Sequence, residues 1–347
     1  MKHIFSYPFA SLLLLLLSGL LASCEYKDLC YDHYHYVNVR VVFDWHNVPD
    51  AAPDGMLVYF YSVDDPSGER VRYDLPGRDG GIVRLLPGTY RAVAYNYFSE
   101  SILFRGYETI PGLEAYTRQS SLEEGTRFST RTDYVPRSVS TADQPVILEP
   151  TALWAAASEE FTLELPDRVT FDSIRAGAGE SETEIRTVVL TPGTRTADVT
   201  VTVHNVPDQV FENQFAGALG GLSPSVWVAS GRKGDGLATQ AFSLSPVGGA
   251  RLRGTFRIFG HCPDSGVDAE GGTHEHILTV YAVLADGTKW YYDFDVTGQM
   301  HDALKNPDPL RIFIDVDGLP VPKPIVNGGG FHPDVDGWSH EVVYLSM

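Results

Sequence analysis

The sequence has few basic residues and lacks the motifs of several common enzyme classes. Its 347 residues carry 26 Lys and Arg against 45 Asp and Glu, a formal net charge of −19. No Lys- or Arg-rich stretch is present that would offset repulsion by phosphate, which excludes nucleic acid as a partner. There is no G-x-S-x-G, no H-E-x-x-H and no P-loop. A carboxylate pair for glycoside hydrolysis would leave no motif, but we predict a protein that is not an enzyme and has no catalytic residue.

Long apolar runs are also lacking. The longest extends from Ala10 to Leu21 and contains six consecutive leucines. It has about a dozen residues, whereas a membrane-spanning helix requires roughly 20. The run follows a short basic head at Lys2, an arrangement typical of a signal peptide. We therefore predict that residues 1–23 are a signal peptide.

The segment Leu21-Ala22-Ser23-Cys24 resembles the lipobox of bacterial lipoproteins. The resemblance implies cleavage between Ser23 and Cys24 and lipidation of Cys24. Acyl chains contribute about 0.8 kcal/mol per buried methylene, so two or more hold a protein on a bilayer almost permanently. We expect membrane lipid as a partner through Cys24, with residues 24–36 as a lipidated tether. Ordinary secretion with Cys24 as a simple thiol is the alternative.

Cysteine is scarce in the remainder of the chain, where only Cys30 and Cys262 occur. An oxidising cell envelope would permit a disulfide between Cys30 and Cys262, but the sequence does not give their separation. Two unpaired, partly buried thiols are the alternative.

Helical periodicity is lacking as well, and strand patterns dominate. Val37–Trp45 and Ala197–His204 alternate polar and apolar residues, as strands with one buried face do. Asp286-Gly287 separates two further strand patterns and predicts a β-hairpin. In the second half of the chain the predicted strands are 186–190, 197–204, 225–229, 252–259, 276–284, 288–296 and 310–316.

A mature chain of more than 300 residues is longer than one core usually holds. We therefore predict an all-β fold of two tandem β-sandwich domains, residues 37–165 and 186–322. A Pro- and Gly-rich tail with a terminal strand, residues 323–347, follows them.

Several segments together resemble the fimbrial anchor and fimbrillin-like lipoproteins of Bacteroidota. The resemblance implies two transthyretin-like β-sandwich domains, lipid attachment to the cell outer membrane and exposure at the cell surface. For anchor members it implies contact with fimbrillin-like protein subunits, although no contact residue carries over. The segments are Cys24–Cys30, Pro87–Tyr90, Lys289–Thr297 and Gly328–Phe331.

Two histidines have spacing of interest for metal binding. His274 and His276 are two residues apart, so on a strand they share one face and could contribute to a zinc site. No third ligand is evident. We therefore predict no metal site and no cofactor.

The sequence favours a structural role at the cell surface. We expect a fimbrial anchor or a fimbria-associated assembly subunit that contacts its partner through strand edges. The apolar run Val342–Leu345 could be a donor strand or the last strand of the domain, and we favour the latter. The alternative function is a glycan-binding surface lipoprotein of a nutrient-uptake system, with glycan stacked on Trp290, Tyr291, Tyr292 and Trp338.

Overall fold

The computed structural model describes residues 36–97, 100–126, 128, 134–164, 185–206, 213–261, 274–303, 305, 308, 310–322 and 337–343. The predicted signal peptide, the cleavage and lipidation site at Ser23 and Cys24, and both Cys30 and Cys262 lie outside these ranges. Cleavage, lipidation and the disulfide therefore stay predictions. None of the helices in the described ranges has the length and apolarity that crossing a bilayer requires.

The regular secondary structure of the described ranges is almost entirely strand. The helical elements there are short: α2 (Leu122–Thr126), the 3-10 turn η1 (Val139–Thr141) and α4 (Thr297–Ala303). Residues 37–347 form one compact unit by their contacts. The predicted all-β class with β-sandwich architecture is confirmed.

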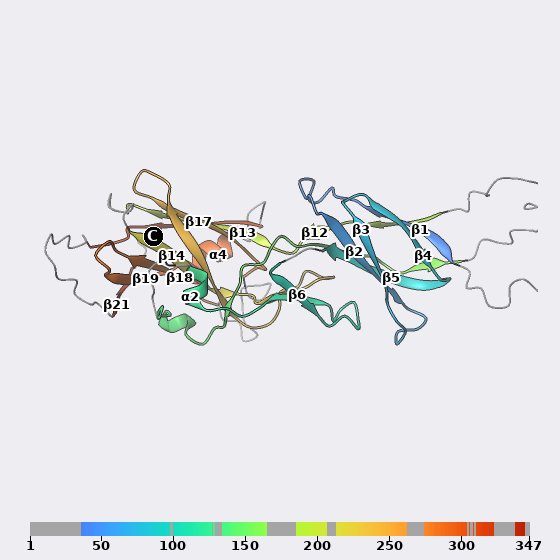
Figure 1. The fold of residues 1–347 in the computed structure, drawn as a ribbon, viewed down its shortest axis with the longest axis horizontal. Helices are drawn as coiled ribbons and strands as arrows, with labels where there is room; N and C mark the ends of the chain where they lie inside the picture. The colour runs from blue at the N-terminus through green and yellow to red at the C-terminus, as the bar shows by residue number, and fades with distance from the viewer. Residues whose placement is uncertain are drawn as a thin grey trace, which may run out of the picture. The chain divides into compact units, whose positions relative to one another are not determined.

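Two sheets face each other in the first half (Figure 1). One has the order β11 (Arg186–Leu190), β1 (Val37–Phe43), β4 (Gly80–Leu85). The other has the order β12 (Gly193–Thr194), β9 (Trp154–Ala157), β5 (Gly88–Asn96), β2 (Gly55–Ser62), β3 (Val71–Pro76), with β10 (Phe161–Leu163) also on β5. The alternation of β1 places Val39 and Val41 in the core between the sheets, while Asn38 and Arg40 face solvent.

The strands β2 and β5 are buried on both faces. Their second face carries Leu57, Tyr59 and Val93, which pack under a smaller sheet of order β15 (Ser225–Trp227), β7 (Glu114–Thr117), β6 (Ile102–Arg105). Double burial explains why these two strands are nearly continuous apolar runs rather than alternating ones.

The second half is built on a long curled sheet (Figure 1). Its order is β20 (Arg311–Asp317), β13 (Ala197–His204), β17 (Leu252–Ile258), β16 (Ala238–Pro246), β14 (Gln214–Leu222), β18 (Ile277–Val283), β19 (Lys289–Asp295), β21 (Trp338–Val342). Inward residues of β13, β17, β18, β19 and β20 share one core. The Asp-Gly hairpin is present, with Gly287 at φ +84° between β18 and β19.

The sequence reading missed β14 and β16, which lie at the centre of this sheet. β14 reads QFAGALGGL, and glycine and alanine are poor strand formers in isolation. Their small size is required by packing, because a Cβ on Gly217 would lie 2.4 Å from the Phe242 ring. Phe242 stacks on Phe256 with ring centroids 4.1 Å apart, inside the core. Tertiary packing therefore requires small residues in β14, although their local strand propensity is low.

Strands cross between the two halves of the chain. β11 pairs in parallel with β1, and β12 pairs with β9, so residues 186–194 belong to the first sheets. In the opposite direction, β8 (Val146–Ile147) pairs in parallel with β16. The domain boundaries at 165 and 186 stay a prediction.

Candidate functional site: a cleft between the edge strands

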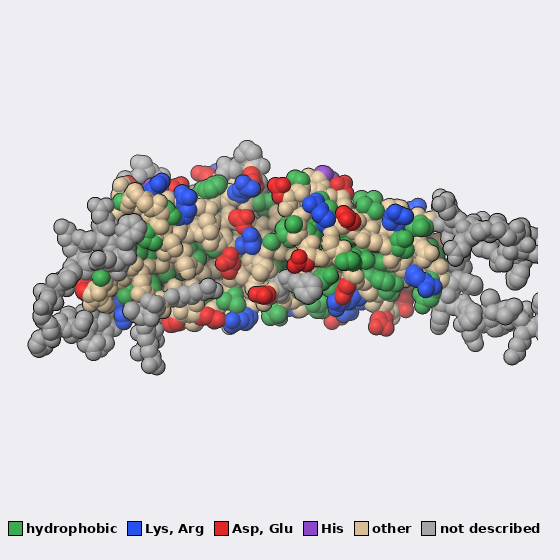
Figure 2. Space-filling model, turned by 45° about the horizontal axis from the view of Figure 1, so that its top comes forward, with side chains coloured by type: hydrophobic (Ala, Val, Ile, Leu, Met, Phe, Trp, Pro, Cys, Tyr) green, Lys and Arg blue, Asp and Glu red, His purple; other side chains and the backbone are tan. Residues whose placement is uncertain are grey.

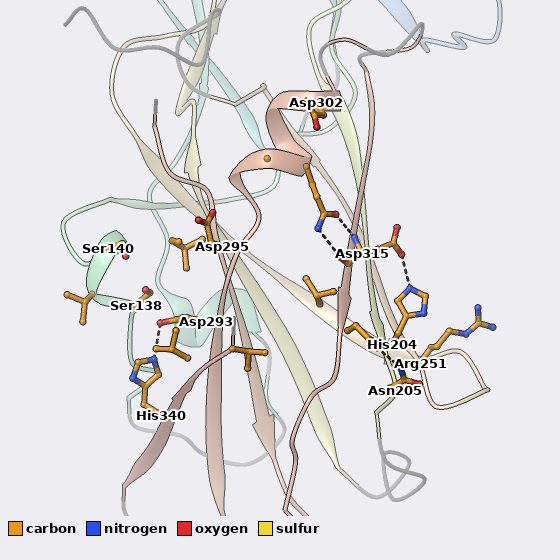
Figure 3. Close-up of a pocket in the computed structure, with 18 of the residues that line it drawn as sticks. Ser138, Ser140, His204, Asn205, Arg251, Asp293, Asp295, Asp302, Asp315 and His340 are labelled. Atoms are coloured by element: carbon orange, nitrogen blue, oxygen red, sulfur yellow. Dashed lines mark hydrogen bonds and ion pairs between the residues drawn. The ribbon is translucent and has the colours of Figure 1, made fainter. Parts of the chain in front are cut away.

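A cavity in the second half lies between β20 with the end of β13 on one side and β19 with β21 on the other. Its volume is about 1090 Å³. Figure 3 shows Asp315 and His204 on one side of the cleft and Asp293 and His340 on the other. Its other lining residues are Ser138, Val139, Ser140, Asn205, Gly249, Arg251, Ile277, Asp295, Gly298, Gln299, Asp302, Val316, Asp317, Val342 and Val343.

The strand β20 offers an open edge to this cleft. Asp198 N–H donates to the Leu310 carbonyl, and Gly318 N–H donates to the His204 carbonyl, both across the parallel pairing with β13. Alternation then directs the backbone groups of Arg311, Phe313, Asp315 and Asp317 away from β13. No other described strand pairs with that edge.

One position of this edge is capped by the helix α4. The Gln299 side chain accepts a hydrogen bond from Asp315 N–H at 2.7 Å and donates one to the Asp315 carbonyl at 2.8 Å. The amide thus occupies the two backbone groups that a neighbouring strand would use. Capping of this kind is one way in which proteins protect an edge strand from pairing with other chains.

The strand β21 is held by its side chains on one face. The His340 ring stacks on Tyr291 with centroids 4.3 Å apart, and its Nε2 lies 3.0 Å from an Asp293 carboxylate oxygen. Trp338 packs edge-on against Tyr281 at 5.6 Å and donates from Nε1 to the Tyr134 carbonyl. Val343 N–H continues the pairing by donating to the Asp293 carbonyl.

The predicted terminal run lies partly in this strand. Val342 ends β21, Val343 packs on the core, and Tyr344 and Leu345 lie outside the described residues. Within the described part, β21 pairs with β19 of its own chain.

The cleft carries more negative than positive charge. Asp293, Asp295, Asp302, Asp315 and Asp317 line it, and Arg251 is the arginine among its lining residues. A hydrogen bond from Lys305 lowers the pKa of Asp302 below its ordinary value. The cleft therefore suits a partner segment that carries basic side chains.

One face of the molecule is mixed in charge. On the face shown in Figure 2, acidic and basic side chains are interspersed, with apolar side chains between them.

The aromatic residues considered for glycan stacking serve internal packing. Tyr292 is fully buried, and Trp290 stacks beside it and packs against the core. Tyr291 and Trp338 lie in the cluster with Tyr281 described above. Tyr292 is therefore not accessible to a glycan, whereas Trp290, Tyr291 and Trp338 are half-buried.

The sequence reading did not find Gln299 or the open edge of β20. Gln299 lies in a short helix with no distinguishing motif, and its role depends on contact with a strand that follows it in the chain. The repeated aspartates of β20, at 315 and 317, were the available signal. Of the predicted histidine pair, only His276 is fully buried; His274 is half-buried.

Fold and site together define an all-β sandwich protein with an open strand edge beside an acidic cleft. The chain belongs to the family described as domain of unknown function DUF5119, whose model matches residues 23–243. Most residues that line the cleft follow position 243.

The comparisons with individual proteins lead to the same group of Bacteroidota proteins that the sequence resembles. The chain is 41% identical over 106 residues to the putative fimbrium anchoring subunit Fim4B of Bacteroides ovatus. That match covers 30% of this chain and spans 31% of the relative, about a third of its length.

One of the similar solved structures shows a shared fold. A crystal structure of a putative adhesin from Bacteroides ovatus has a TM-score of 0.55 at 22% identity, covering 83% of this chain and 95% of that one. The fimbrial anchor protein Mfa2 from Porphyromonas gingivalis aligns with a TM-score of 0.45 at 17% identity, over 82% of this chain and 89% of that one.

Proposed function

We propose that this protein is a structural component of the cell surface, held by lipid on Cys24 in the outer membrane, that anchors or assembles with fimbrillin-like subunits. The similarity to a fimbrium anchoring subunit supports the fimbrial part of the proposal. The lipobox-like segment before Cys24 supports the lipid anchor. No catalytic role is part of the proposal.

The observation that carries the mechanism is the open edge of β20 beside the acidic cleft. A strand from a partner subunit pairs with the outward carbonyl of Arg311 and the outward backbone groups of Phe313, which precede the position that Gln299 caps. Main-chain hydrogen bonds give such a contact affinity, and alternate side chains give it specificity. The aspartates of the cleft receive basic side chains of the incoming segment.

A substitution at Phe313 tests this mechanism. Proline has no N–H, so Phe313→Pro removes one outward donor from the edge while the β13 side of β20 keeps its hydrogen bonds. Phe313 is 61% exposed, so the loss of its side chain should disturb the fold little. Phe313→Ala is the matched control, because it loses the same ring and keeps the N–H.

The measurement is mild crosslinking on intact cells, followed by purification of the protein and mass spectrometry of the captured partners. We expect fimbrillin-like subunits with the wild type and with Phe313→Ala, and at least tenfold less with Phe313→Pro at equal surface amount. Equal capture by the proline and alanine variants would exclude the β20 edge. Recovery of a glycan-uptake porin instead would overturn the fimbrial assignment.

A further inference from the structure

Three histidines from separate segments meet beside the end of the strand β14. His261 follows β17, His276 directly precedes β18, and His301 lies in the helix α4. One ring nitrogen from each lies within 4.8 Å of the others. The ring centroids are 5.1 to 5.3 Å apart.

The hydrogen bond of His276 fixes the position of its proton. Its Nδ1 lies 3.2 Å from the Gly220 carbonyl oxygen. A carbonyl only accepts, so Nδ1 must carry the hydrogen, and Nε2 of the neutral ring then has a free lone pair. A ring nitrogen bonded to a backbone carbonyl, with the other nitrogen free, is the usual arrangement of a metal-binding histidine.

The backbone of β14 is shaped for this contact. The register shifts between Leu219 and Leu222, and Gly221 adopts φ +80°. A Cβ on Gly221 would lie 2.6 Å from Nδ1 of His276. The irregularity thus allows the Gly220 carbonyl to reach the histidine, and bulges often re-aim groups in this way at functional sites.

Two of the three histidines are shielded from solvent, and His301 is half-buried. His276 is fully buried and His261 is 4% exposed. Nε2 of His276 and Nε2 of His301 are buried and make no hydrogen bond within the described residues. Buried polar atoms of native proteins nearly always have a partner, so two such nitrogens side by side require an explanation.

Burial acts on two of the three rings. Burial, with a smaller effect from the His261 ring, lowers the pKa of His276 to about 3. Burial also lowers the pKa of His301.

We infer that His261, His276 and His301 form a binding site for a divalent transition-metal ion of the zinc class. Three imidazoles are the protein ligands of one common type of zinc site, with the fourth position left to water or another ligand. Nitrogens held at about 2.0–2.1 Å from one tetrahedral ion lie about 3.4 Å apart. Each ring needs to move by no more than about 1 Å, which small side-chain rotations supply.

The ion joins elements that are far apart in the sequence. It connects the end of β17, the start of β18 and the helix α4. The same helix carries Gln299, which caps the edge of β20. Metal binding therefore stabilises the position of α4 and, through it, the capped edge.

Metal titration of the full chain tests the inference. After removal of metal by a chelator, Zn²⁺ is added and followed by calorimetry and by thermal unfolding. We expect one ion per chain and a rise in Tm, and His276→Gln and His301→Gln should each weaken binding at least tenfold. His204→Gln is the matched control, because it removes a histidine of the same half that hydrogen-bonds Asp315 outside the cluster.

Two measurements on the unmodified chain avoid dependence on the folding of variants. X-ray absorption of the zinc-loaded protein should show three imidazole ligands, and hydrogen exchange of residues 297–303 should slow when zinc is added. Binding that is unchanged in both cluster variants, absence of stoichiometric binding, or a zinc spectrum with fewer than three imidazoles would overturn the inference. None of these readouts depends on a fimbrial partner.

Discussion

Gly221 is a single residue on which both the end of β14 and the position of His276 depend. Its φ of +80° disfavours any residue with a Cβ, and a Cβ would lie 2.4 Å from the Glu275 carbonyl oxygen. Strain and overlap act together at this position. At Gly318 a substitution meets backbone strain but no overlap. Its φ is +76°, and no atom lies within 4 Å of an added Cβ.

Gly221→Ala should therefore lower the free energy of unfolding by about 3 kcal/mol or more, whereas Gly318→Ala should lower it by about 1 kcal/mol. Urea unfolding at neutral pH measures both. Equal effects of the two substitutions would show that the backbone around Gly221 relaxes away from the added methyl.

Glu114 is a second residue whose substitution should have a large effect on stability, because of its surroundings. It lies on β7, its side chain is 9% exposed, and it accepts hydrogen bonds from Arg105 at 2.6 Å and from the Ser225 hydroxyl. Burial alone would raise the pKa of Glu114, but these hydrogen bonds outweigh it and hold the pKa below 4.5. Ser225 belongs to β15, so this carboxylate joins the two halves of the chain.

A lowered pKa predicts acid sensitivity. The unfolded chain takes up a proton at Glu114 near pH 4.5 while the folded chain does not, so the stability from this group is present above pH 4.5 and is lost as pH falls below it. In Glu114→Gln, stability should be lower at pH 7 by about 1–3 kcal/mol and should fall less between pH 5 and pH 3.

Urea unfolding between pH 7 and pH 3 measures this dependence. Asp74→Asn is the control, because Asp74 also pairs with an arginine but its side chain is 50% exposed, so its loss should cost less than about 1 kcal/mol. An acid slope in Glu114→Gln as steep as in the wild type would contradict the assignment.

At the scale of elements, the edge strand β20 and the helix α4 act as a pair. The helix follows β19 directly, and Asp295 accepts a hydrogen bond from Thr297 N–H at its start. Gln299 then reaches the exposed backbone of Asp315. An edge strand without such a cap is a site for pairing with another chain.

Gln299→Met keeps the volume of the side chain but removes both hydrogen bonds to Asp315. We expect the free energy of unfolding to fall by about 1 kcal/mol. A hydrogen bond contributes about 0.5–1.5 kcal/mol, and at this exposed position water replaces the lost bonds in part. We also expect more self-association, measured by sedimentation, because the edge is opened. Gln299→Glu retains the acceptor for Asp315 N–H, so its stability and self-association should lie between those of the wild type and of Gln299→Met. A Gln299→Met variant that matches the wild type in both measurements would show that the cap has no protective effect.

At the scale of the whole molecule, the sheets of the two halves exchange strands. β11 and β12 join the first sheets, β8 joins the second, and the sheet of β6, β7 and β15 takes strands from both. A force applied to one half is therefore transmitted through backbone hydrogen bonds as well as through side chains. Such a connection suits a protein that holds a partner at a membrane.

The anchor itself is tested by fractionation. Cys24→Ala removes the predicted lipid attachment, so the protein should move from the membrane fraction to the soluble fraction of the cell envelope. Immunoblots of both fractions measure the shift, and Cys30→Ala is the matched control. A Cys24→Ala protein that stayed with the membrane would contradict the lipid anchor.

The all-β class could be predicted because alternation is a local property. Residues such as Val199, Val201 and Val203 point to one face whatever lies beside them, and Asp286-Gly287 sets its hairpin through backbone conformation alone. The strand β14 was missed because its glycines depend on tertiary contacts. The Phe242 ring and the backbone near His276 leave no room for a Cβ at these positions.

The sequence by itself determined the strand-rich class, the acidic charge and the signal and lipobox patterns, since each depends on residues close together in the chain. Only the tertiary structure decided which strands are edges, that Gln299 caps Asp315, and that His261 and His301 join His276 rather than His274. Those relations depend on how a curled sheet brings distant segments together. The spacing of residues along the chain does not show which distant segments the sheet brings together.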